Sequence, residues 1–393
     1  MKLVYADNAA TTEMSERAKQ AFLDNIDNYG NPSSLHNMGS KAAQVLDNSR
    51  ERVAKALGCE SRELYFTSGG SESDNWAIKG AAISMRKKGK THIISTAFEH
   101  HAVLHTLESL EKQGFSVTYL NVYEDGYVRT EDLKTAITDN TGLVTIMYAN
   151  NEIGTVMPIA EIGAICREKG IIFHTDAVQA VGHIEIDVKK QNIDLLSLSA
   201  HKFHGPKGIG ALYIRKGIVI PNLMDGGAQE RGKRAGTENI AAAAATAAAL
   251  EEALTDLEKK NNRVSALRDK LIDGLLKIER SRLNGGISPR LSGNVSVCFE
   301  GVEGEALLLS LDLKGISASS GSACTSGSLE PSHVLLALGL PHEIAHGSLR
   351  LSLCDFNTEE DVDYILSVIP EIIDRLRDMS PVWETIKANE GKR

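Results

Sequence analysis

The segment LLSLSAHKFHGPKGIGALYIR, residues 195–215, decides how this chain folds. It holds two apolar runs that favour β-strands, LLSLSA and GALYIR, with the short turn HKFHGPK between them. Two parallel strands need a crossover connection of about a dozen or more residues, and this turn is too short to provide one. We therefore expect the two strands to run antiparallel.

More runs rich in β-branched and aromatic residues precede this pair, namely LYFT, HIIST, VTYLNV, LVTIMYAN and IIFHTDA. Segments with helical periodicity, such as ESDNWAIKGAAISMRKK and IAEIGAICREKG, separate most of them. This alternation is typical of a mainly parallel sheet that helices cover. The sequence predicts an α/β fold with a seven-stranded, mainly parallel sheet.

The last third of the chain has a different pattern. Residues 238–279 consist of strong helix formers without proline and predict long helical structure that links two domains. Beyond Ser281, the strand patterns NVSVCFE and SLRLSL and the helix patterns EGEALLLSL and EEDVDYILSVIPEIIDRL indicate a smaller α+β unit. We expect a large domain over residues 15–257 and a small domain formed by residues 1–14 and 258–393.

Composition narrows the class of protein. With 42% hydrophobic residues, a chain of 393 residues can bury a large core. A net charge of -9 and the absence of a long basic run argue against nucleic-acid binding. The five cysteines form no CxxC pair, which favours a reducing compartment. Because no apolar run reaches about 18 residues, we expect no membrane span and a cytoplasmic location.

Lys202 and Asp176 each follow a predicted strand of the sheet. Side chains at the carboxyl ends of neighbouring strands converge on one crevice. A lysine and an aspartate there suit pyridoxal phosphate, because the lysine forms the Schiff base and the carboxylate pairs with the pyridinium nitrogen. Taken alone, Lys202 has the ordinary interpretation of a loop lysine beside a hydrogen-bonded histidine, and Asp176 that of a strand-end cap or a surface ion pair.

The segment FTSGGSESDN, residues 66–75, leaves a strand, turns on two glycines and enters a helix near Ser71. Backbone N–H groups without partners at a helix start bind phosphate, and a serine hydroxyl adds a donor. Ser199 and His201, beside the lysine, are candidates to complete such a phosphate cup. The alternative is ordinary helix capping by a serine that glutamate follows.

The segment EHHAVLH contributes three histidines. His101 and His105 share one helical face, but the sequence offers no third ligand nearby, so a metal site is the weaker interpretation. His100 lies at a strand-to-helix junction, where an imidazole can stack on a planar cofactor ring and shuttle protons at neutral pH.

A family resemblance now joins these segments. FTSGGSESDN, EHHAVL, ANNEIGTV, HTDAVQ, SLSAHKFHGPKGIG, RAGTEN and SSGSACTSGSLEPSHVLLALG, in this order, resemble the pyridoxal-phosphate-dependent cysteine desulfurases of the NifS/IscS type, which belong to the class-V aminotransferases. The likeness extends from YADNAATT and GNPSSLH to SLRLSL. It implies a fold-type I homodimer that converts L-cysteine to L-alanine and passes sulfur to an acceptor such as an iron-sulfur scaffold or a thiolation protein.

The resemblance also implies roles around the cofactor ring and the substrate. Lys202 would be the Schiff-base residue, Asp176 the pyridinium partner and His100 the stacking acid and base. Polar contacts to the substrate side of the ring and to its 3-hydroxyl would come from Asn151 and Gln179. The bidentate guanidinium of Arg350, in SLRLSL, would clamp the substrate carboxylate.

Further implied roles concern the phosphate and the transferred sulfur. The phosphate would be bound by four residues of one subunit, namely Gly70, Ser71, Ser199 and His201. Thr237 of a second subunit would complete this site. Cys324, in the serine- and glycine-rich segment 317–328, would accept sulfur as a persulfide. A segment that cannot pack a core supplies the mobility that this transfer needs, whereas an exposed thiol in a linker is the ordinary alternative. No resident metal is implied, only transient iron-sulfur ligation by Cys324.

This chain departs from the family pattern at Ser71, where many relatives have threonine, and at Cys354 and Asp355, where relatives usually have a small and a basic residue. Two other classes of function stay open. A selenocysteine lyase or an aminotransferase of the same fold would share Lys202 and Asp176 but not the acceptor cysteine. A nucleotide-binding module would use the glycines of GPKGIG, which lack the helix entry and the acidic residue of a dinucleotide fingerprint.

Overall fold

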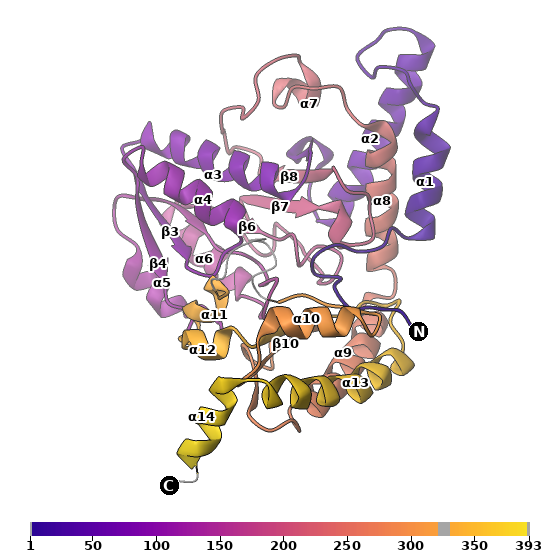
Figure 1. Ribbon diagram of the computed structural model, residues 1–393. Helices are drawn as coiled ribbons and strands as arrows, with labels where there is room; N and C mark the ends of the chain where they lie inside the picture. Colours follow the sequence, from indigo (N-terminus) through magenta and orange to yellow (C-terminus); the bar gives the residue numbers. More distant parts are fainter. Residues whose placement is uncertain (1, 321–330, 391–393) are drawn as a thin grey trace.

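A computed structural model describes residues 2–320 and 331–390 of the chain. One seven-stranded sheet lies at its centre, in the order β2, β8, β7, β6, β5, β3, β4 (Figure 1). The bounds of the strands are Leu64–Thr67 (β2), His92–Thr96 (β3), Ser116–Leu120 (β4), Thr141–Thr145 (β5), Ile172–Asp176 (β6), Leu195–Ser199 (β7) and Gly210–Ile214 (β8). Each strand overlaps one of the runs that the sequence indicates.

The direction of the strands follows the length of their connections. β7 and β8 run antiparallel, with Ser199 opposite Gly210, as the short turn between them predicts. β8 is also antiparallel to β2. The other neighbours pair in parallel, β3 with β4 and β5, β5 with β6, and β6 with β7. The carboxyl ends of the parallel strands therefore meet at one edge, which is where such sheets place their sites.

Helices cover both faces of the sheet (Figure 1). On one face, α3 (Gly70–Arg86) and α4 (His101–Glu111) pack against a buried cluster that includes Ile93 of β3. Ile94, the next residue, belongs to the larger cluster on the other face. That face is covered by α1 (Glu16–Ile26), α2 (Asn37–Ala56), α5 (Thr130–Ala136), α6 (Ile159–Lys169) and α8 (Ile240–Leu254). A parallel sheet buried on both faces explains why its strands read as continuous apolar runs.

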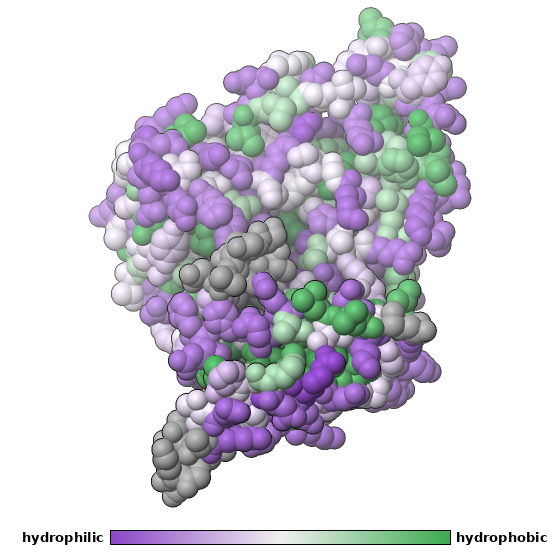
Figure 2. All heavy atoms as spheres, viewed as in Figure 1, coloured by the Kyte–Doolittle hydropathy of each residue, from purple (hydrophilic) through white to green (hydrophobic). Residues whose placement is uncertain are grey.

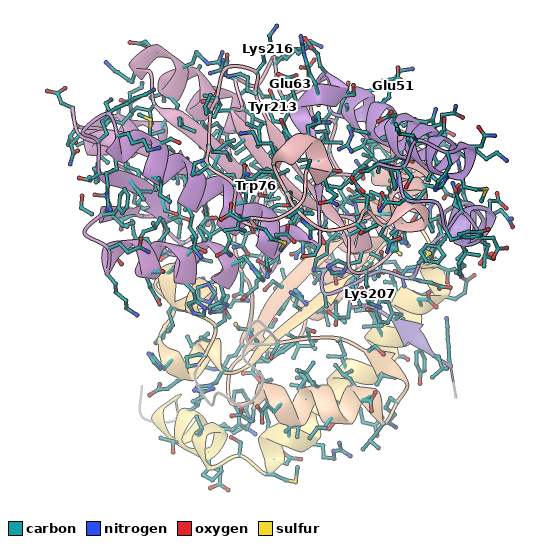
Figure 3. All side chains as sticks on the ribbon, turned by 90° about the horizontal axis from the view of Figure 1, so that it is seen from above. Glu51, Glu63, Trp76, Lys207, Tyr213 and Lys216 are labelled. Atoms are coloured by element: carbon teal, nitrogen blue, oxygen red, sulfur yellow. The ribbon has the colours of Figure 1, made fainter. Side chains whose placement is uncertain are left out.

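Two large aromatic side chains fix the sheet from its two sides (Figure 3). Trp76 of α3 is buried, and its indole Nε1 donates a hydrogen bond to the Pro221 carbonyl oxygen at 2.9 Å. Tyr213 of β8 is buried in the opposite cluster. Burying one such side chain contributes on the order of 2–3 kcal/mol. The packing of Trp76 also holds α3 on the sheet, so the start of this helix at Gly70 has a fixed position.

The helical segment predicted after Glu238 is two helices. α8 ends at Leu254, and α9 (Leu257–Leu275) begins after Asp256, whose φ of 53° is left-handed. α8 packs against α1 and α2 through a run of buried alanines. The small alanine side chains permit this close helix packing. By contrast, α9 presents only one face to the second core of the protein. The break lets the chain pass from one core to the other.

A smaller sheet has the order β12, β10, β9 and is antiparallel throughout. Its strands β9 (Ser281–Leu283), β10 (Asn294–Phe299) and β12 (Ser348–Ser352) pack with α9, α10 (Gly304–Asp312) and α13 (Glu359–Asp378). β1 (Val4–Tyr5) joins this unit by parallel pairing with β11 (Ile316–Ser317). The expected α+β unit is therefore present, whereas the domain limits at 14/15 and 257/258 stay a prediction.

Short elements complete the part of the chain that the structure describes. They are the 3-10 turns η1 (Ser61–Glu63) and η2 (Ala200–Lys202), and the helices α7 (Gln229–Gly232), α11 (His333–Ala337), α12 (His342–Ala345) and α14 (Pro381–Glu390). Among the helices of residues 2–320 and 331–390, none combines the length and apolarity that crossing a bilayer requires.

Candidate active site

Lys202 ends the turn η2, directly after β7. Its ammonium Nζ donates hydrogen bonds to the carbonyl oxygens of Ala9, at 2.6 Å, and Ala10, at 2.7 Å. The side chain is half-buried and points to the N-terminal segment, which crosses the carboxyl edge of the large sheet. A fully solvated lysine would have neither feature, so the position of Lys202 is compatible with a role in a site.

Asp176 ends β6, the neighbour of β7, and its side chain is buried. The carboxylate Oδ1 accepts a hydrogen bond from the backbone N–H of Val178 at 2.9 Å. Burial raises the pKa of Asp176 to about 6, against the lowering effects of that N–H group and of Lys202. A buried carboxylate beside the lysine excludes a surface ion pair, and at neutral pH it is still mainly ionised.

A cavity of about 310 Å³ lies between these two residues and the smaller sheet. Among the residues that line it are the following candidates from the sequence: Gly70, Ser71, His100, Asn151, Asp176, Gln179, Ser199, His201, Lys202 and Arg350. Thr237 is exposed and does not line the cavity. Cys324 lies outside the described residues.

The start of α3 forms one wall of the cavity. Gly69 is its N-cap residue, with φ 154°, and it provides no side-chain cap for the first N–H groups. A side chain at Gly70 would place its Cβ 2.6 Å from Cγ2 of Val178, so only glycine fits there. Glu72 accepts a hydrogen bond from the N–H of Ser68 and pairs with Arg234. The helix start therefore keeps donors available to an anion.

His100 is the N-cap residue of α4, and its Nδ1 accepts a hydrogen bond from the N–H of Ala102 at 3.1 Å. Burial, followed by the charge of Lys202, lowers the pKa of His100 to about 4. The imidazole is therefore neutral at pH 7, with its proton on Nε2. In the same cavity, burial and Lys202 also lower the pKa of His201 to about 4, and its Nδ1 lies 3.1 Å from Oγ1 of Thr11.

A third histidine joins the pair on α4. The ring centroids of His101 and His105 are 5.0 Å apart, and the ring of His333 lies 4.5 Å from His101. Sequence spacing could not reveal this neighbour, because α11 is far away along the chain. Within residues 2–320 and 331–390, the three rings do not bring their nitrogens close enough together to share one ion.

Arg350 reaches the cavity from β12 and is 3% exposed. Its Nη2 pairs with Oδ1 of Asp7 at 2.9 Å, and its Nη1 donates to the carbonyl oxygen of Asn151 at 3.1 Å. Its Nε has no hydrogen-bond partner within the described part of the chain. Gln179 donates from Nε2 to the Ala9 carbonyl oxygen at 2.9 Å. The N-terminal segment is thus part of the site, and Asp7 was not among the residues that sequence reasoning identified.

Asp74 of α3 is a second residue that sequence reasoning missed. It is 1% exposed, and Oδ1 has no hydrogen-bond partner among the described residues. That atom lies 3.6 Å from Nε2 of the buried His174. Burial and the charge of Asp176 raise the pKa of Asp74 well above its ordinary value. Its burial and the neighbouring charge of Asp176 both favour the protonated form of Asp74.

The groups around the cavity indicate which kind of molecule it can bind. A primary amine, a buried carboxylate and a helix start with available donors surround one cavity at the ends of β6, β7 and β2. This donor set suits an aromatic aldehyde that carries a basic ring nitrogen and a phosphate. Arg350, on the opposite wall, is suited to a carboxylate.

Comparison with known proteins agrees with this geometry. Residues 4–365 match the family described as aminotransferase class-V. The chain is 56% identical over 396 residues, all of both chains, to "Cysteine desulfurase IscS" of Clostridium botulinum strain Hall. It is 58% identical to "Cysteine desulfurase IscS" of Methanosarcina thermophila, over 97% of this chain and 94% of that protein.

A solved structure has the same fold. The structure titled "NIFS-LIKE PROTEIN" is 40% identical and superposes with a TM-score of 0.89 over 95% of this chain and all of the other. The predicted fold class, an α/β protein with a mainly parallel seven-stranded sheet of fold-type I, is therefore confirmed.

Proposed function

This chain belongs to the class-V aminotransferase family, and from that membership we propose that it is a cysteine desulfurase that converts L-cysteine to L-alanine. The observation that carries the proposal is the meeting of Lys202, Asp176 and Arg350 around one cavity. The amine and the buried carboxylate serve a cofactor, while the arginine serves an amino-acid carboxylate. Full-length identity of 56% to a protein named cysteine desulfurase supports this assignment.

The cofactor in this proposal is pyridoxal 5'-phosphate, which supplies an electron sink that weakens bonds at the substrate α-carbon and β-carbon. Lys202 offers the amine for covalent attachment. Asp176, ionised above about pH 6, holds a proton on the ring nitrogen. The donors at Gly70 and Ser71, together with Ser199 and His201, bind the phosphate.

His100 lies at the cavity wall as a neutral imidazole, with Nδ1 occupied by the Ala102 N–H group. Its Nε2 is therefore the atom that can exchange protons with bound substrate. Because the pKa of His100 is lowered to about 4, this nitrogen gives up an acquired proton readily at neutral pH. Asn151 and Gln179 complete the polar lining of the site.

Arg350 binds the carboxylate of L-cysteine in this proposal. The guanidinium is oriented by the Asn151 carbonyl oxygen and by Asp7. A substrate carboxylate would either share the guanidinium with Asp7 or displace Asp7 from it. The Nε donor of Arg350 is available to the substrate carboxylate. Arginine suits this task because its planar fork binds a carboxylate through two N–H groups.

The acceptor of the sulfur atom is Cys324. Its thiolate attacks the substrate sulfur, the bond from sulfur to Cβ breaks, a persulfide forms on the enzyme, and the carbon takes up a proton to become alanine. The persulfide is reversible and therefore serves as a carrier to an acceptor protein, such as an iron-sulfur scaffold or a thiolation protein.

We also propose a homodimer in which Thr237 of one subunit completes the phosphate site of the other. Thr237 is exposed on the loop before α8. The tip formed by α1 and α2 carries exposed apolar side chains, and hydrophobic residues gather at that end of the molecule in Figure 2. The exposed large apolar side chains at the end of α1 and in the loop before α2 are Leu23, Ile26, Tyr29 and Leu35. Such a surface is typical of a subunit interface.

The proposed location is the cytoplasm, since Cys59, Cys166, Cys298 and Cys354 are free thiols, as in a reducing compartment.

The decisive experiment supplies the purified protein with pyridoxal phosphate, L-cysteine and a thiol reductant. We expect alanine and sulfide in equal amounts, and none from Lys202→Ala, which should also lose the yellow absorbance that survives dialysis in the wild type. An aminotransferase would instead aminate an added 2-oxo acid and release no sulfide. Amination without sulfide would contradict the proposal.

A further inference from the structure

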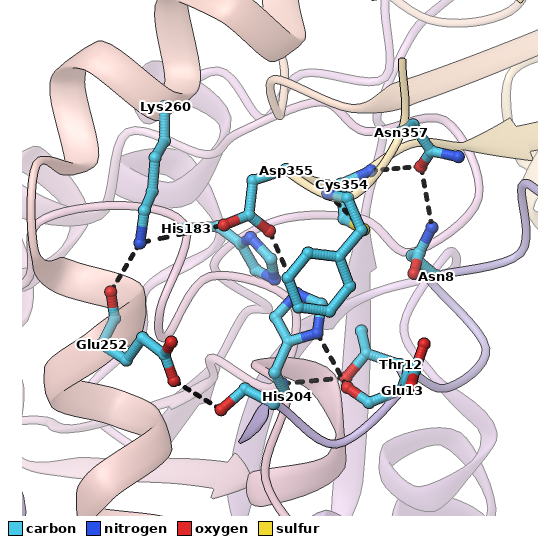
Figure 4. Close-up of polar contacts among 12 residues, drawn as sticks. Asn8, Thr12, Glu13, His183, His204, Glu252, Lys260, Cys354, Asp355 and Asn357 are labelled. Carbon is cyan, nitrogen blue, oxygen red and sulfur yellow. Dashed lines mark hydrogen bonds and ion pairs between the residues drawn. The ribbon is translucent and has the colours of Figure 1, made fainter. Parts of the chain in front are cut away.

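A second cluster of reactive side chains lies between the turn that follows β7 and the end of β12 (Figure 4). His204 follows the lysine turn, and Cys354 and Asp355 follow β12. One donor atom from each of the three, an imidazole nitrogen, a sulfur and a carboxylate oxygen, lies within 4.8 Å of the other two. Of the three residues, His204 and Cys354 are buried. None of the three lines the cavity that contains Lys202, so the proposed desulfurase mechanism assigns them no role.

The orientation of His204 is fixed by the N-terminal segment. Its Nδ1 lies 2.8 Å from the carbonyl oxygen of Glu13, an acceptor, so Nδ1 carries the proton and donates it. Its backbone N–H donates to Oγ1 of Thr12 at 2.8 Å. In the neutral imidazole Nε2 then carries the lone pair, and this nitrogen lies 3.5 Å from Oδ1 of Asp355. A backbone carbonyl on one nitrogen and an open lone pair on the other is the usual state of a metal-binding histidine.

Cys354 and Asp355 are held by the turn that they begin. The N–H of Cys354 donates to Oδ1 of Asn357 at 2.9 Å, and the N–H of Phe356 donates to Sγ of Cys354 at 3.4 Å. The ring of Phe356 packs on His204, with centroids 4.6 Å apart. The second oxygen of Asp355 lies 3.8 Å from Nζ of Lys260. Asp355 can thus give one oxygen to an ion and keep the other near the lysine.

Room for a further ligand adjoins these groups. A cavity of about 70 Å³ is lined by His204, Cys354 and Asp355, together with polar side chains such as Asn8, His183 and Asn261. This volume is large enough to hold at least one water molecule. His183 is not a competing ligand through Nε2, which is 2.9 Å from the carbonyl oxygen of Lys202.

We propose that Nε2 of His204, Sγ of Cys354 and one carboxylate oxygen of Asp355 bind a zinc ion, with water from the adjoining cavity as the fourth ligand. One thiolate, one imidazole and one carboxylate form a tetrahedral donor set that zinc accepts, whereas magnesium and calcium require oxygen donors. Binding exchanges the thiol proton of Cys354, which leaves to solvent, for a bond from sulfur to zinc.

The ion would link the turn that carries Lys202 to the strand that carries Arg350, and the active site needs these two at fixed relative positions. His204 lies two residues after Lys202, and Cys354 lies four residues after Arg350. His204 also contacts the N-terminal segment that carries Asp7. Zinc at this position is a structural clamp between the lysine turn and β12, and no step of catalysis passes through it.

Zinc uptake tests the proposal directly. The dimer loaded with pyridoxal phosphate is made in a Cys324→Ser background, which removes the competing thiol, and freed of metal with a chelator. Equilibrium dialysis with Zn²⁺ should give one zinc per subunit and a higher Tm. X-ray absorption should detect one sulfur at about 2.3 Å and nitrogen or oxygen ligands at about 2.0–2.2 Å.

Cys354→Ser and Asp355→Asn, both close in shape to the native residues, should weaken zinc binding at least tenfold and abolish the rise in Tm. Cys298→Ser removes another buried thiol, which accepts a hydrogen bond from Asn284 and does not line the cavity beside His204, and it should bind zinc as the background does. Uptake that persists in Cys354→Ser, a zinc spectrum without sulfur, or no uptake at all would each overturn the proposal.

Discussion

Nη2 of Arg350 lies 2.9 Å from Oδ1 of Asp7, so the arginine proposed for the substrate carboxylate already binds a carboxylate of its own chain. The pair is well shielded, with side chains 4% and 18% exposed. Because two anions compete for one guanidinium, substrate binding includes the loss or weakening of this ion pair.

Asp7→Asn should therefore lower the KM for L-cysteine about two- to tenfold, which corresponds to roughly 0.4–1.4 kcal/mol. The amide keeps a hydrogen bond to Arg350 without the competing charge. Steady-state kinetics of alanine release measure the change. Asp125→Asn, which removes an exposed partner of Arg129, is the matched control and should leave KM unchanged. A raised KM in Asp7→Asn would mean that Asp7 positions the arginine instead of competing for it.

The pKa of Asp176 predicts an acid limb in the pH profile. Burial raises this pKa to about 6, so the carboxyl group is protonated below pH 6 and loses its hold on a ring proton. Activity should therefore fall as the pH is lowered through about 6. Asp176→Asn should retain cofactor absorbance but turn over at least 100-fold more slowly, without this limb. Wild-type activity in that variant would remove Asp176 from the mechanism.

Asp74 should oppose folding at neutral pH. Its pKa is raised in the folded state, so folding takes up a proton, and stability falls as the pH rises above the unfolded pKa of about 3.9. Asp74→Asn should raise Tm by a few degrees at pH 8 and by less at pH 5. The pKa of Asp187 is lowered, mainly by the backbone N–H of Lys190, so Asp187→Asn should change Tm in the opposite direction. Equal effects of Asp74→Asn at both pH values would show that Asp74 is not protonated on folding.

Thr237 provides a test of the shared site. Lys202→Ala and Thr237→Glu, each inactive alone, should regain about a quarter of wild-type activity when mixed under subunit exchange. Half of the dimers in an equal mixture are hybrids, and each hybrid has one complete site. Gel filtration of the separate variants checks that both remain dimers. No recovery in exchanging dimers would indicate a site built within one chain.

Cys324→Ser should separate cofactor binding from sulfur capture. The variant should bind pyridoxal phosphate and change its absorbance with L-cysteine, yet release almost no alanine, because a serine hydroxyl is hardly ionised at neutral pH. Mass spectrometry after one equivalent of L-cysteine should locate an extra sulfur on the peptide with Cys324 in the wild type only. Extra sulfur on Cys59 or Cys166 instead would refute the assignment.

The sequence predicted the large sheet and the meeting of Lys202 and Asp176 at one edge of it for a physical reason. Strand patterns and connection lengths determine which strand ends meet, and Lys202 and Asp176 stand at two of those ends. The break between α8 and α9 escaped prediction because neither proline nor glycine marks Asp256, which adopts a left-handed conformation. Helix propensity alone does not report that the two helices belong to different cores.

The places of Asp7 and Asp74 at the site could not be predicted from the sequence for other reasons. Asp7 contacts Arg350 only because β1 pairs with β11 in the second unit, a long-range contact that no local pattern encodes. Asp74 lies in a segment whose sequence indicates phosphate donors, and its burial depends on packing against His174. The His204, Cys354 and Asp355 cluster likewise depends on the approach of β12 to the lysine turn.

The N-terminal segment has a consequence for biosynthesis. The carbonyl oxygens that receive Lys202 belong to Ala9 and Ala10, and this segment is fixed by bonds to Ser352 and by the pairing of Val4 with Ile316. A ribosome that adds about 5–20 residues per second makes Val4 tens of seconds before its partner strand. This segment is thus made long before the strand that holds it, and a nascent chain with a finished large sheet still has an open active site.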